Sequence, residues 1–231
     1  ARGDLRLGRA DWGDNNILLA LNGGNVDAWL QSLIVGHTYT TDRQEAGVRR
    51  LDLRNHGGTV AIDARTVRIG TTTGDGQLIQ GRVDLAGATV QAGDVTVGCN
   101  PNCHASSYGA LAMSNTQFEV ANSLLVGESG TVSVNTGRDV AGLNLDRDAT
   151  LTVYDGGTID ISFAATFEGR GIYYGLRWGG SHVAELDALQ AAGKLSIAET
   201  VTQPRIPGIF YHGGATYVGV PPPPGTIFTI R

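Results

Sequence analysis

Residues 51–70 read LDLRNHGGTVAIDARTVRIG and contain three apolar pairs, each with one residue between its two members. The pairs are Leu51/Leu53, Val60/Ile62 and Val67/Ile69. A spacing of two residues is the period of a β-strand that buries one face. The stretch therefore predicts three short strands separated by turns, and Gly70 follows the third strand at once.

This pattern recurs five times between Leu19 and Ile161. The first pairs are Leu19/Leu21, Leu51/Leu53, Val83/Leu85, Leu111/Met113 and Leu143/Leu145, so the copies begin 32, 32, 28 and 32 residues apart. The second pairs are Val26/Ala28, Val60/Ile62, Val90/Ala92, Phe118/Val120 and Leu151/Val153. The third pairs are Leu33/Val35, Val67/Ile69, Val95/Val97, Leu124/Val126 and Ile159/Ile161. Four third pairs precede a glycine, at Gly36, Gly70, Gly98 and Gly127, which we interpret as corners with positive φ or close chain contact.

Three short strands cannot bury their inward faces alone, whereas stacking one copy on the next closes a continuous core. We therefore predict an all-β fold, a three-faced parallel β-solenoid (β-helix) of about five coils over residues 17–163. A β-sandwich or barrel also has many short strands with turns between them. Neither gives a reason for a three-strand unit that repeats near 32 residues.

The segments outside the repeat are expected to cover its ends. Residues 1–16 form an N-terminal strand or cap, with Trp12 and Trp29 covering the first coil. Residues 164–220 form a C-terminal cap with a helix over 181–193 and a hairpin near residues 212–215. Residues 221–231 read PPPPGTIFTIR, which predicts a stiff proline-rich arm and a terminal strand.

Four long connections are predicted to lie along one edge of the stack: HTYTTDRQEAGVRR, TTTGDGQLIQGR, CNPNCHASSYGA and ESGTVSVNTGRDVA. Their candidate ligand-binding residues are Tyr39, Asp42, Glu45 and Tyr108. Cys99 and Cys103 are the only cysteines, and a disulfide between them would brace one connection locally. The run from Cys99 to His104 is one residue longer than the haem-attachment spacing, so haem, a metal or free thiols are the alternatives.

Composition and spacing argue against several functions. The net charge of −5 provides no basic surface for nucleic acid, and no run of 18 apolar residues predicts a membrane span. A polysaccharide lyase or glycosidase would need clustered carboxylates, but acidic residues do not recur at matching positions in adjacent coils. Asp146 and Asp148 are interpreted as turn residues, and we find no compact cluster of arginines with acids. The histidines have no zinc-site spacing. We therefore expect a protein that is not an enzyme and has no cofactor or metal.

Two parts of the chain resemble known exported proteins. The segments NSLLVGESGTVSV and ATLTVYDGGTIDI resemble passenger regions of bacterial autotransporters and β-solenoid surface proteins of GC-rich bacteria. The segment YYGLRWGGSHVAELDALQAAGKL with YHGGATYVGVPPPPGT resembles the carboxyl-terminal part of exported bacterial proteins whose sorting tail begins with a Val-Pro-Glu-Pro type motif, here with proline in place of the glutamate. The resemblance implies export and identifies no activity. The first residue, Ala1, is consistent with a removed leader or a trimmed chain, and we expect a secreted bacterial protein.

The sequence thus predicts a non-catalytic, secreted structural protein, a subunit of an extracellular fibre or surface layer that assembles head to tail with copies of itself. The residues expected to mediate assembly are Leu5, Leu7, Thr226, Ile227, Phe228, Thr229 and Ile230. The alternative is a carbohydrate-binding or carbohydrate-active β-helix that contacts surface glycans through its edge connections.

Overall fold

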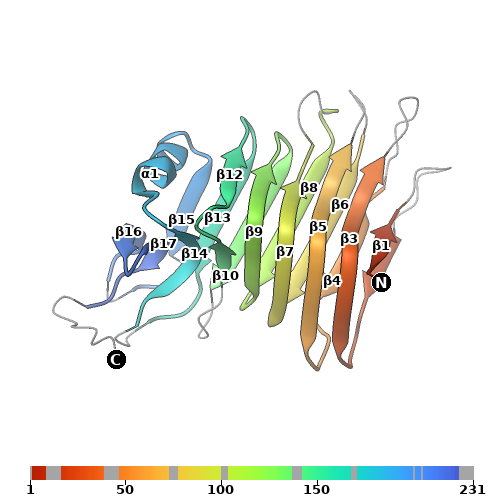
Figure 1. Cartoon of the computed structure of the whole chain (residues 1–231), viewed down its shortest axis with the longest axis horizontal. Helices are drawn as coiled ribbons and strands as arrows, with labels where there is room; N and C mark the ends of the chain where they lie inside the picture. The colour runs from red at the N-terminus through yellow and green to blue at the C-terminus, as the bar shows by residue number, and fades with distance from the viewer. Residues whose placement is uncertain are drawn as a thin grey trace.

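The residues that the structure describes form two β-sheets and one helix (Figure 1). The structure is a computed structural model, which describes residues 2–8, 17–38, 47–72, 78–99, 104–136, 142–167, 171–199, 201–203 and 205–223. Sheet A contains, in spatial order, β1 (Gly3–Leu7), β3 (Val26–Thr38), β5 (Val60–Thr72), β7 (Ala88–Val97), β9 (Gln117–Val126), β11 (Leu143–Leu145), β14 (Tyr173–Gly179), β17 (Ala215–Val220) and β16 (Gly208–His212), and β12 (Thr150–Val153) also pairs with β9. Sheet B contains β15 (Leu195–Glu199), β13 (Thr158–Phe163), β10 (Gly130–Thr136), β8 (Tyr108–Ser114), β6 (Gln80–Ala86), β4 (Arg49–Leu53) and β2 (Ile17–Ala20).

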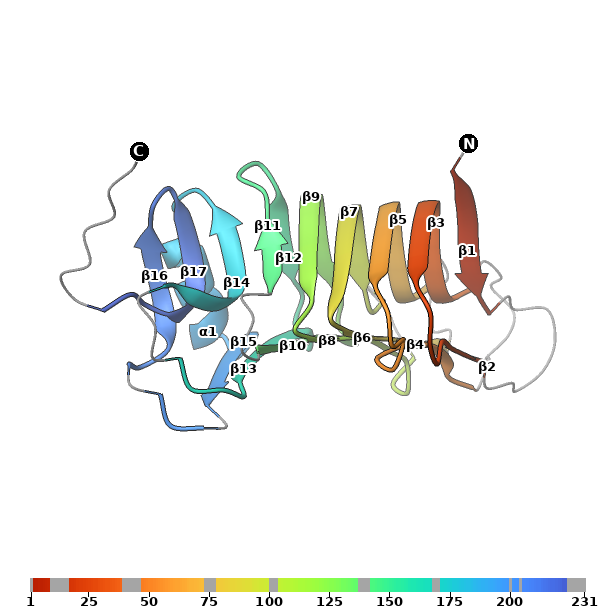
Figure 2. The ribbon, with the colours of Figure 1, turned by 90° about the horizontal axis from the view of Figure 1, so that it is seen from below.

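The chain passes from one sheet to the other in each copy, and successive copies lie side by side in both sheets (Figure 2). Sheet B pairs only in parallel, whereas sheet A is mixed because the β16–β17 hairpin adds to β14 in the antiparallel direction. The two sheets enclose one apolar core between them. The result is a two-sheeted, sandwich-like stack of mostly parallel strands with one helix near its C-terminal end.

The prediction of three faces is wrong, because the second and third pairs of each early copy belong to one long strand. Strand β3 runs without interruption from Val26 to Thr38, and β5 runs from Val60 to Thr72 beside it. The linking residues 29–32 and 63–66 contain neither glycine nor proline, so the chain stays extended where a turn was expected. Each of the first four copies therefore contributes one strand to sheet B and one longer strand to sheet A.

The assignment of the fifth copy is also wrong. Strand β10, which contains Val132 and Val134, pairs with β8 and occupies the first-strand position, although it was expected to be an edge connection. Leu143 and Leu145 pair with Phe118 and Val120 and therefore occupy the second-pair position. Ile159 pairs with Val132 in sheet B. Val132 and Val134 also form an apolar pair, but Val132 follows Leu111 by 21 residues rather than by the 28 or 32 of the other copies, so the pair was not recognised as a first pair.

Inward-facing aliphatic residues of sheet B form rows that cross the sheet in register. One row in sheet B consists of Leu19, Leu51, Val83, Leu111, Val132, Ile159 and Leu195. From Leu51 to Leu195 no member of this row exposes more than 2% of its surface. Burial of these rows removes apolar surface from water, and it is the main stabilising contribution to the stack.

The predicted glycine corners are places of very close backbone contact. Gly36, Gly70 and Gly98 have positive φ values of 64°, 61° and 81°. A Cβ added at Gly70 would lie 2.3 Å from the carbonyl oxygen of Tyr108, and one added at Gly98 would lie 2.4 Å from the amide nitrogen of Gly130. At each corner, the backbone near the end of a sheet A strand thus lies directly against the first residues of a sheet B strand.

The C-terminal part continues both sheets and then covers one end of them. Strands β14 and β15 add to β11 and β13 in parallel. Helix α1 (Val183–Ala191) lies within the predicted range of 181–193, and His182 rather than Ser181 occupies its N-cap position. Leu186 is the fully buried residue of the helix, and the β16–β17 hairpin turns at Gly213 and Gly214.

We expect Gly70→Ala to lower the free energy of unfolding by at least about 2 kcal/mol. The substitution forces a residue with a Cβ into positive φ and places that Cβ against the Tyr108 carbonyl. Gly193→Ala is the matched control, because its φ is 71° but nothing lies within 4 Å of the added Cβ, and we expect a loss of about 1 kcal/mol. Urea unfolding followed by circular dichroism measures both, and equal losses would contradict the role assigned to close contact.

Candidate functional site

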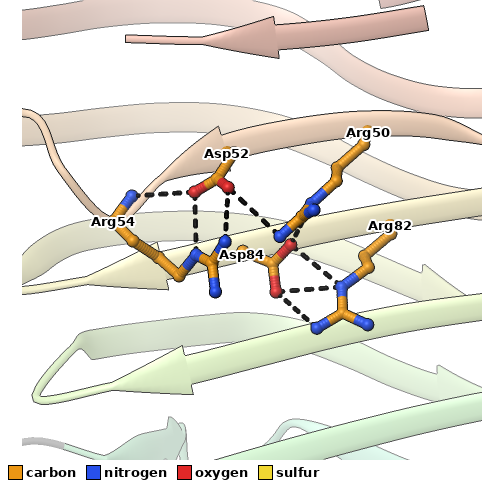
Figure 3. A network of polar contacts seen from close by, with 5 residues as sticks. All are labelled: Arg50, Asp52, Arg54, Arg82 and Asp84. Carbon is orange, nitrogen blue, oxygen red and sulfur yellow. Dashed lines mark hydrogen bonds and ion pairs between the residues drawn. The ribbon is translucent and has the colours of Figure 1, made fainter. Parts of the chain in front are cut away.

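An arginine–aspartate network lies on the outward face of sheet B (Figure 3). Strand β4 alternates buried Leu51 and Leu53 with outward Arg50 and Asp52, and β6 repeats this alternation. Arg50 lies opposite Arg82 in the strand register, and Asp52 lies opposite Asp84. Stacking in register therefore brings like charges together, which is unfavourable unless each charge finds a partner of opposite sign.

Asp84 is the centre of the network. Its side chain is 2% exposed and accepts hydrogen bonds from Arg50 Nε at 2.7 Å, Arg82 Nε at 2.9 Å and Arg82 Nη2 at 2.8 Å. Burial acts to raise the pKa of Asp84, but the hydrogen bonds and charges of Arg82 and Arg50 outweigh it, so the pKa is lowered. The carboxylate is therefore buried, ionised and bound by two guanidinium groups.

Asp52 forms the second half of the network. Arg54 donates to it in a bidentate pair, from Nε at 2.9 Å and Nη2 at 2.6 Å, and Arg50 Nη2 lies 3.1 Å from Asp52 Oδ2. The hydrogen bond from Arg54 is the largest cause that lowers the pKa of Asp52 to about 2. Arg50 thus bridges both carboxylates and joins the two strands through their side chains (Figure 3).

The network corrects the expectation that the chain has no compact cluster of arginines with acids. A signal for it was present in the sequence, since Arg50-Leu51-Asp52 and Arg82-Val83-Asp84 lie 32 residues apart, which is the repeat distance. Both carboxylates have lowered pKa values, so neither is protonated near neutral pH as a general acid requires. The arrangement is suited to bracing two strands.

A shallow depression of about 290 Å³ adjoins the network on the same face. Arg54, Arg82 and Asp84 form one side of it. Small polar side chains of later strands, Ser133 on β10 and Ser162 on β13, form the opposite side.

A second and larger hollow, the corner groove, is lined by residues from the middle of β3, β5, β7 and β9 in sheet A, together with Arg2. Its volume is about 480 Å³, and its lining includes Arg2, Asp63, Arg65 and Asp94. Asp63 accepts hydrogen bonds from Arg2 Nη1 and Nη2, both at 2.7 Å, and from the Trp29 indole at 2.9 Å. The hydrogen bond from Arg2 is the main cause that lowers the pKa of Asp63. No residue of the groove was singled out as a site residue from the sequence, and Trp29 was expected to cover the first coil.

The structure describes few of the residues that the sequence singled out. Tyr39, Asp42, Glu45, Cys103 and residues 226–230 lie outside the described residues. Leu5 and Leu7 lie on β1 and pair with Leu33 and Val35, and Leu7 is buried in the core. Tyr108 begins strand β8, and its burial raises its pKa.

Cys99 is buried, with 1% of its surface exposed, and Ser129 Oγ lies 3.6 Å from its sulfur. The disulfide with Cys103 stays a prediction, because Cys103 is not among the described residues. Asp146 and Asp148 are exposed in the turn between β11 and β12. Among the residues that the structure describes, no group of three or more His, Cys, Asp and Glu residues is placed to hold a metal ion.

The comparisons with known proteins give no relative: no protein-family model, no curated protein and no solved structure matches the chain. Within the described part of the chain, α1 is too short to cross a membrane. The protein is therefore classed by its geometry alone, as a two-sheeted stack of mostly parallel strands. It has an ion-pair network on one sheet and a polar groove on the other.

We expect Asp84→Ala to lower the free energy of unfolding by about 3 kcal/mol, because it removes a buried carboxylate and leaves two arginines without their partner. Asp4→Ala is the matched control, since Asp4 pairs with Arg6 at the surface, and we expect its melting temperature to equal that of the wild type. Differential scanning calorimetry of both variants makes the comparison. An Asp84→Ala variant as stable as the wild type would show that the network does not brace the strands.

The lowered pKa values of Asp52 and Asp84 predict acid sensitivity. A carboxylate whose folded pKa lies below its unfolded value of about 3.9 contributes stability above that value. This contribution is lost as the pH falls through the folded pKa, which for Asp52 is about 2. We therefore expect the free energy of unfolding to fall between about pH 4 and pH 2.

The double variant Asp52→Asn/Asp84→Asn tests the assignment of this acid sensitivity. It is less stable at neutral pH but cannot lose the same ionisations, so its free energy of unfolding should fall less over that pH range. Urea midpoints measured at several pH values provide the comparison. An equal fall in the free energy of unfolding of both proteins would show that other groups cause the acid sensitivity.

Proposed function

We propose that the chain is a non-catalytic structural subunit that assembles end to end into an extracellular fibre or surface layer. The observation that carries the proposal is the pairing of the outermost strands. Sheet A ends in β1 and β16, and sheet B ends in β2 and β15, each with one strand neighbour among the described strands. An edge strand presents backbone N–H and C=O groups that can pair with a strand from another chain.

The strand directions favour a translated copy as the partner. β15 is parallel to β13, and β2 is parallel to β4, so β15 and β2 of successive molecules run in the same direction. In sheet A, two antiparallel steps from β14 to β17 and from β17 to β16 restore the direction of the stack at β16. Both sheets could thus be extended by parallel pairing, and an interface between different ends of identical chains continues into a filament unless a rotation closes it.

Side chains at the ends are compatible with this contact. Leu18 on β2 is 61% exposed, and Ala20 beside it is also exposed. In the register of sheet B, Ala20 corresponds to Ser196 of β15, which is also small and exposed. A neighbouring copy that covers Leu18 would remove exposed apolar surface from water.

The proline-rich arm is the second proposed contact. It begins directly after β17, and the Pro221 carbonyl accepts a hydrogen bond from Arg205, which fixes the start of the arm on the C-terminal part. The segment Thr226–Ile230 alternates like a strand in sequence, and we assign to it the role of an added strand on an edge of a neighbouring copy. Leu5 and Leu7 act indirectly in this proposal, because their side chains hold β1 on the core while its outer edge receives the neighbour.

The proposed location, outside a bacterial cell, is supported by the resemblance of the repeat and of the C-terminal segment to exported surface proteins. The close spacing of Cys99 and Cys103 agrees with an oxidising compartment. The partner is a second copy of the same chain.

Leu18→Arg and deletion of residues 224–231 test the assembly. We expect the wild type to form rods that lengthen with protein concentration, and we expect both variants to shift toward monomer, because one adds a charge at the contact and the other removes the added strand. Light scattering coupled to size-exclusion chromatography, with negative-stain electron microscopy, measures the assemblies.

Thr89→Arg is the matched control, because Thr89 is exposed on β7 in the middle of sheet A, away from the end strands of both sheets. It should assemble like the wild type. A wild type that stays monomeric at every concentration, or rods that are unchanged in both Leu18→Arg and the deletion, would refute the proposal.

A further inference from the structure

The corner groove has a floor of small residues and walls of polar ones. Ala64, Ala92 and Gly93 line it together with longer polar side chains. A Cβ at Gly93 would lie 2.5 Å from the carbonyl oxygen of Arg65, so this position accepts no larger residue without a shift of the backbone. Next to Gly93 the strand pairing changes register, because β9 has one extra residue between Val120 and Ser123. Such a bulge bends the strand and redirects side chains.

Trp29 flanks the groove and is held in a fixed orientation. The indole Nε1 donates a hydrogen bond to Asp63 at 2.9 Å, and the Arg2 guanidinium carbon lies 4.8 Å from the ring centroid. The residue is nevertheless 63% exposed. Large aromatic side chains dominate the energetics of interfaces, so an oriented and exposed indole beside a groove is a suitable surface for an apolar face of a ligand.

The polar groups of the groove are also fixed in advance. Arg2 holds Asp63 in a bidentate pair, and Ser123 Oγ donates to Asp94 Oδ1 at 2.6 Å. Asn122 Nδ2 lies 3.5 Å from Asp94 Oδ2. Carboxylates and amides arranged in this way can accept from and donate to hydroxyl groups without reorganising, which lowers the entropic cost of binding.

Charge and length narrow the class of ligand. The charged lining residues are two arginines and two aspartates, Arg2, Arg65, Asp63 and Asp94, so their charges cancel. A cancelled charge gives no preference for an anion or a cation. The groove reaches across β3, β5, β7 and β9, which at about 4.8 Å per strand spacing is a length of about 14 Å.

We propose that the corner groove binds an uncharged oligosaccharide chain of several sugar units. The Trp29 indole stacks on the C–H face of one sugar ring, and Asp63, Gln91 and Asp94 hydrogen-bond hydroxyl groups along the chain. Sugar rings have apolar faces and hydroxyl edges, and this combination matches an exposed indole beside planar polar side chains. The proposal is independent of the assembly proposed above and of the edge connections.

The test uses the whole chain at concentrations where light scattering shows a monomer. A panel of uncharged glucan, mannan, galactan and chitin fragments of about two to six units is screened, and fragments that bind are measured by titration calorimetry. We expect affinity to rise with chain length until the groove is filled. Trp29→Ala should weaken binding by at least about tenfold, and Gln91→Ala should weaken it by a smaller factor.

Tyr211→Ala is the control, because Tyr211 is an aromatic residue on β16 that is 52% exposed and lies far from the groove in the strand order. It should bind like the wild type. Circular dichroism checks that each variant is folded. If Trp29→Ala does not fold, Gln91→Ala still provides the test. The proposal is overturned if the wild type binds no fragment, if folded Trp29→Ala and Gln91→Ala both bind as the wild type does, or if only sulfated glycans added as a further arm bind and salt abolishes that binding.

Discussion

The structure depends on the in-register stacking of inward aliphatic rows from one copy to the next. In a strand the side-chain period is two, so a slip of one residue would turn a whole row from the core to solvent. The row from Leu51 through Val83 and Leu111 to Ile159 is almost fully buried, and such a slip would expose every member of it. This penalty fixes the register of all strands in sheet B. It also determines the outward face, because every outward residue must lie beside its counterpart in the next copy.

The outward face of sheet B is therefore subject to a repulsion between like charges that the apolar core does not have. Repetition places Arg50 beside Arg82 and Asp52 beside Asp84, and like charges at one strand spacing repel each other. The network resolves this repulsion by pairing along a strand and diagonally between strands, since Asp84 binds Arg82 two residues away and Arg50 on the neighbouring strand. Beyond β6 the register positions hold Ala110 and Ala112, so the charged rows end after two copies. The ion pairs thus follow from the stacking that the core imposes.

The sequence could predict what depends on period and repeat distance. The inward pairs, the parallel relation of the copies and the corners at Gly36, Gly70 and Gly98 follow from patterns that are visible without coordinates. The number of sheets could not be predicted in the same way, because it depends on whether residues 29–32 and 63–66 turn or remain extended, and apolar period alone does not distinguish these conformations. The arginine–aspartate network was visible as a repeated Arg-x-Asp at the repeat distance, but only the pairing of β4 with β6 shows that these side chains meet. The corner groove had no sequence signal, since it depends on the side-by-side pairing of four strands and on the bulge in β9.

The two proposed contacts use different surfaces of the stack. The proposed assembly uses the end strands β1, β2, β15 and β16, whereas the corner groove is lined by residues of β3, β5, β7 and β9. Growth of a filament by translation would therefore leave each groove open and would repeat it at a constant interval. A shallow groove that binds one sugar chain weakly becomes effective when many copies bind the same polymer, because later contacts are intramolecular and have a high effective concentration. The two proposals are therefore geometrically compatible, because the contacts at the ends of the stack leave the groove on its side open. Each proposal still depends on its own residues.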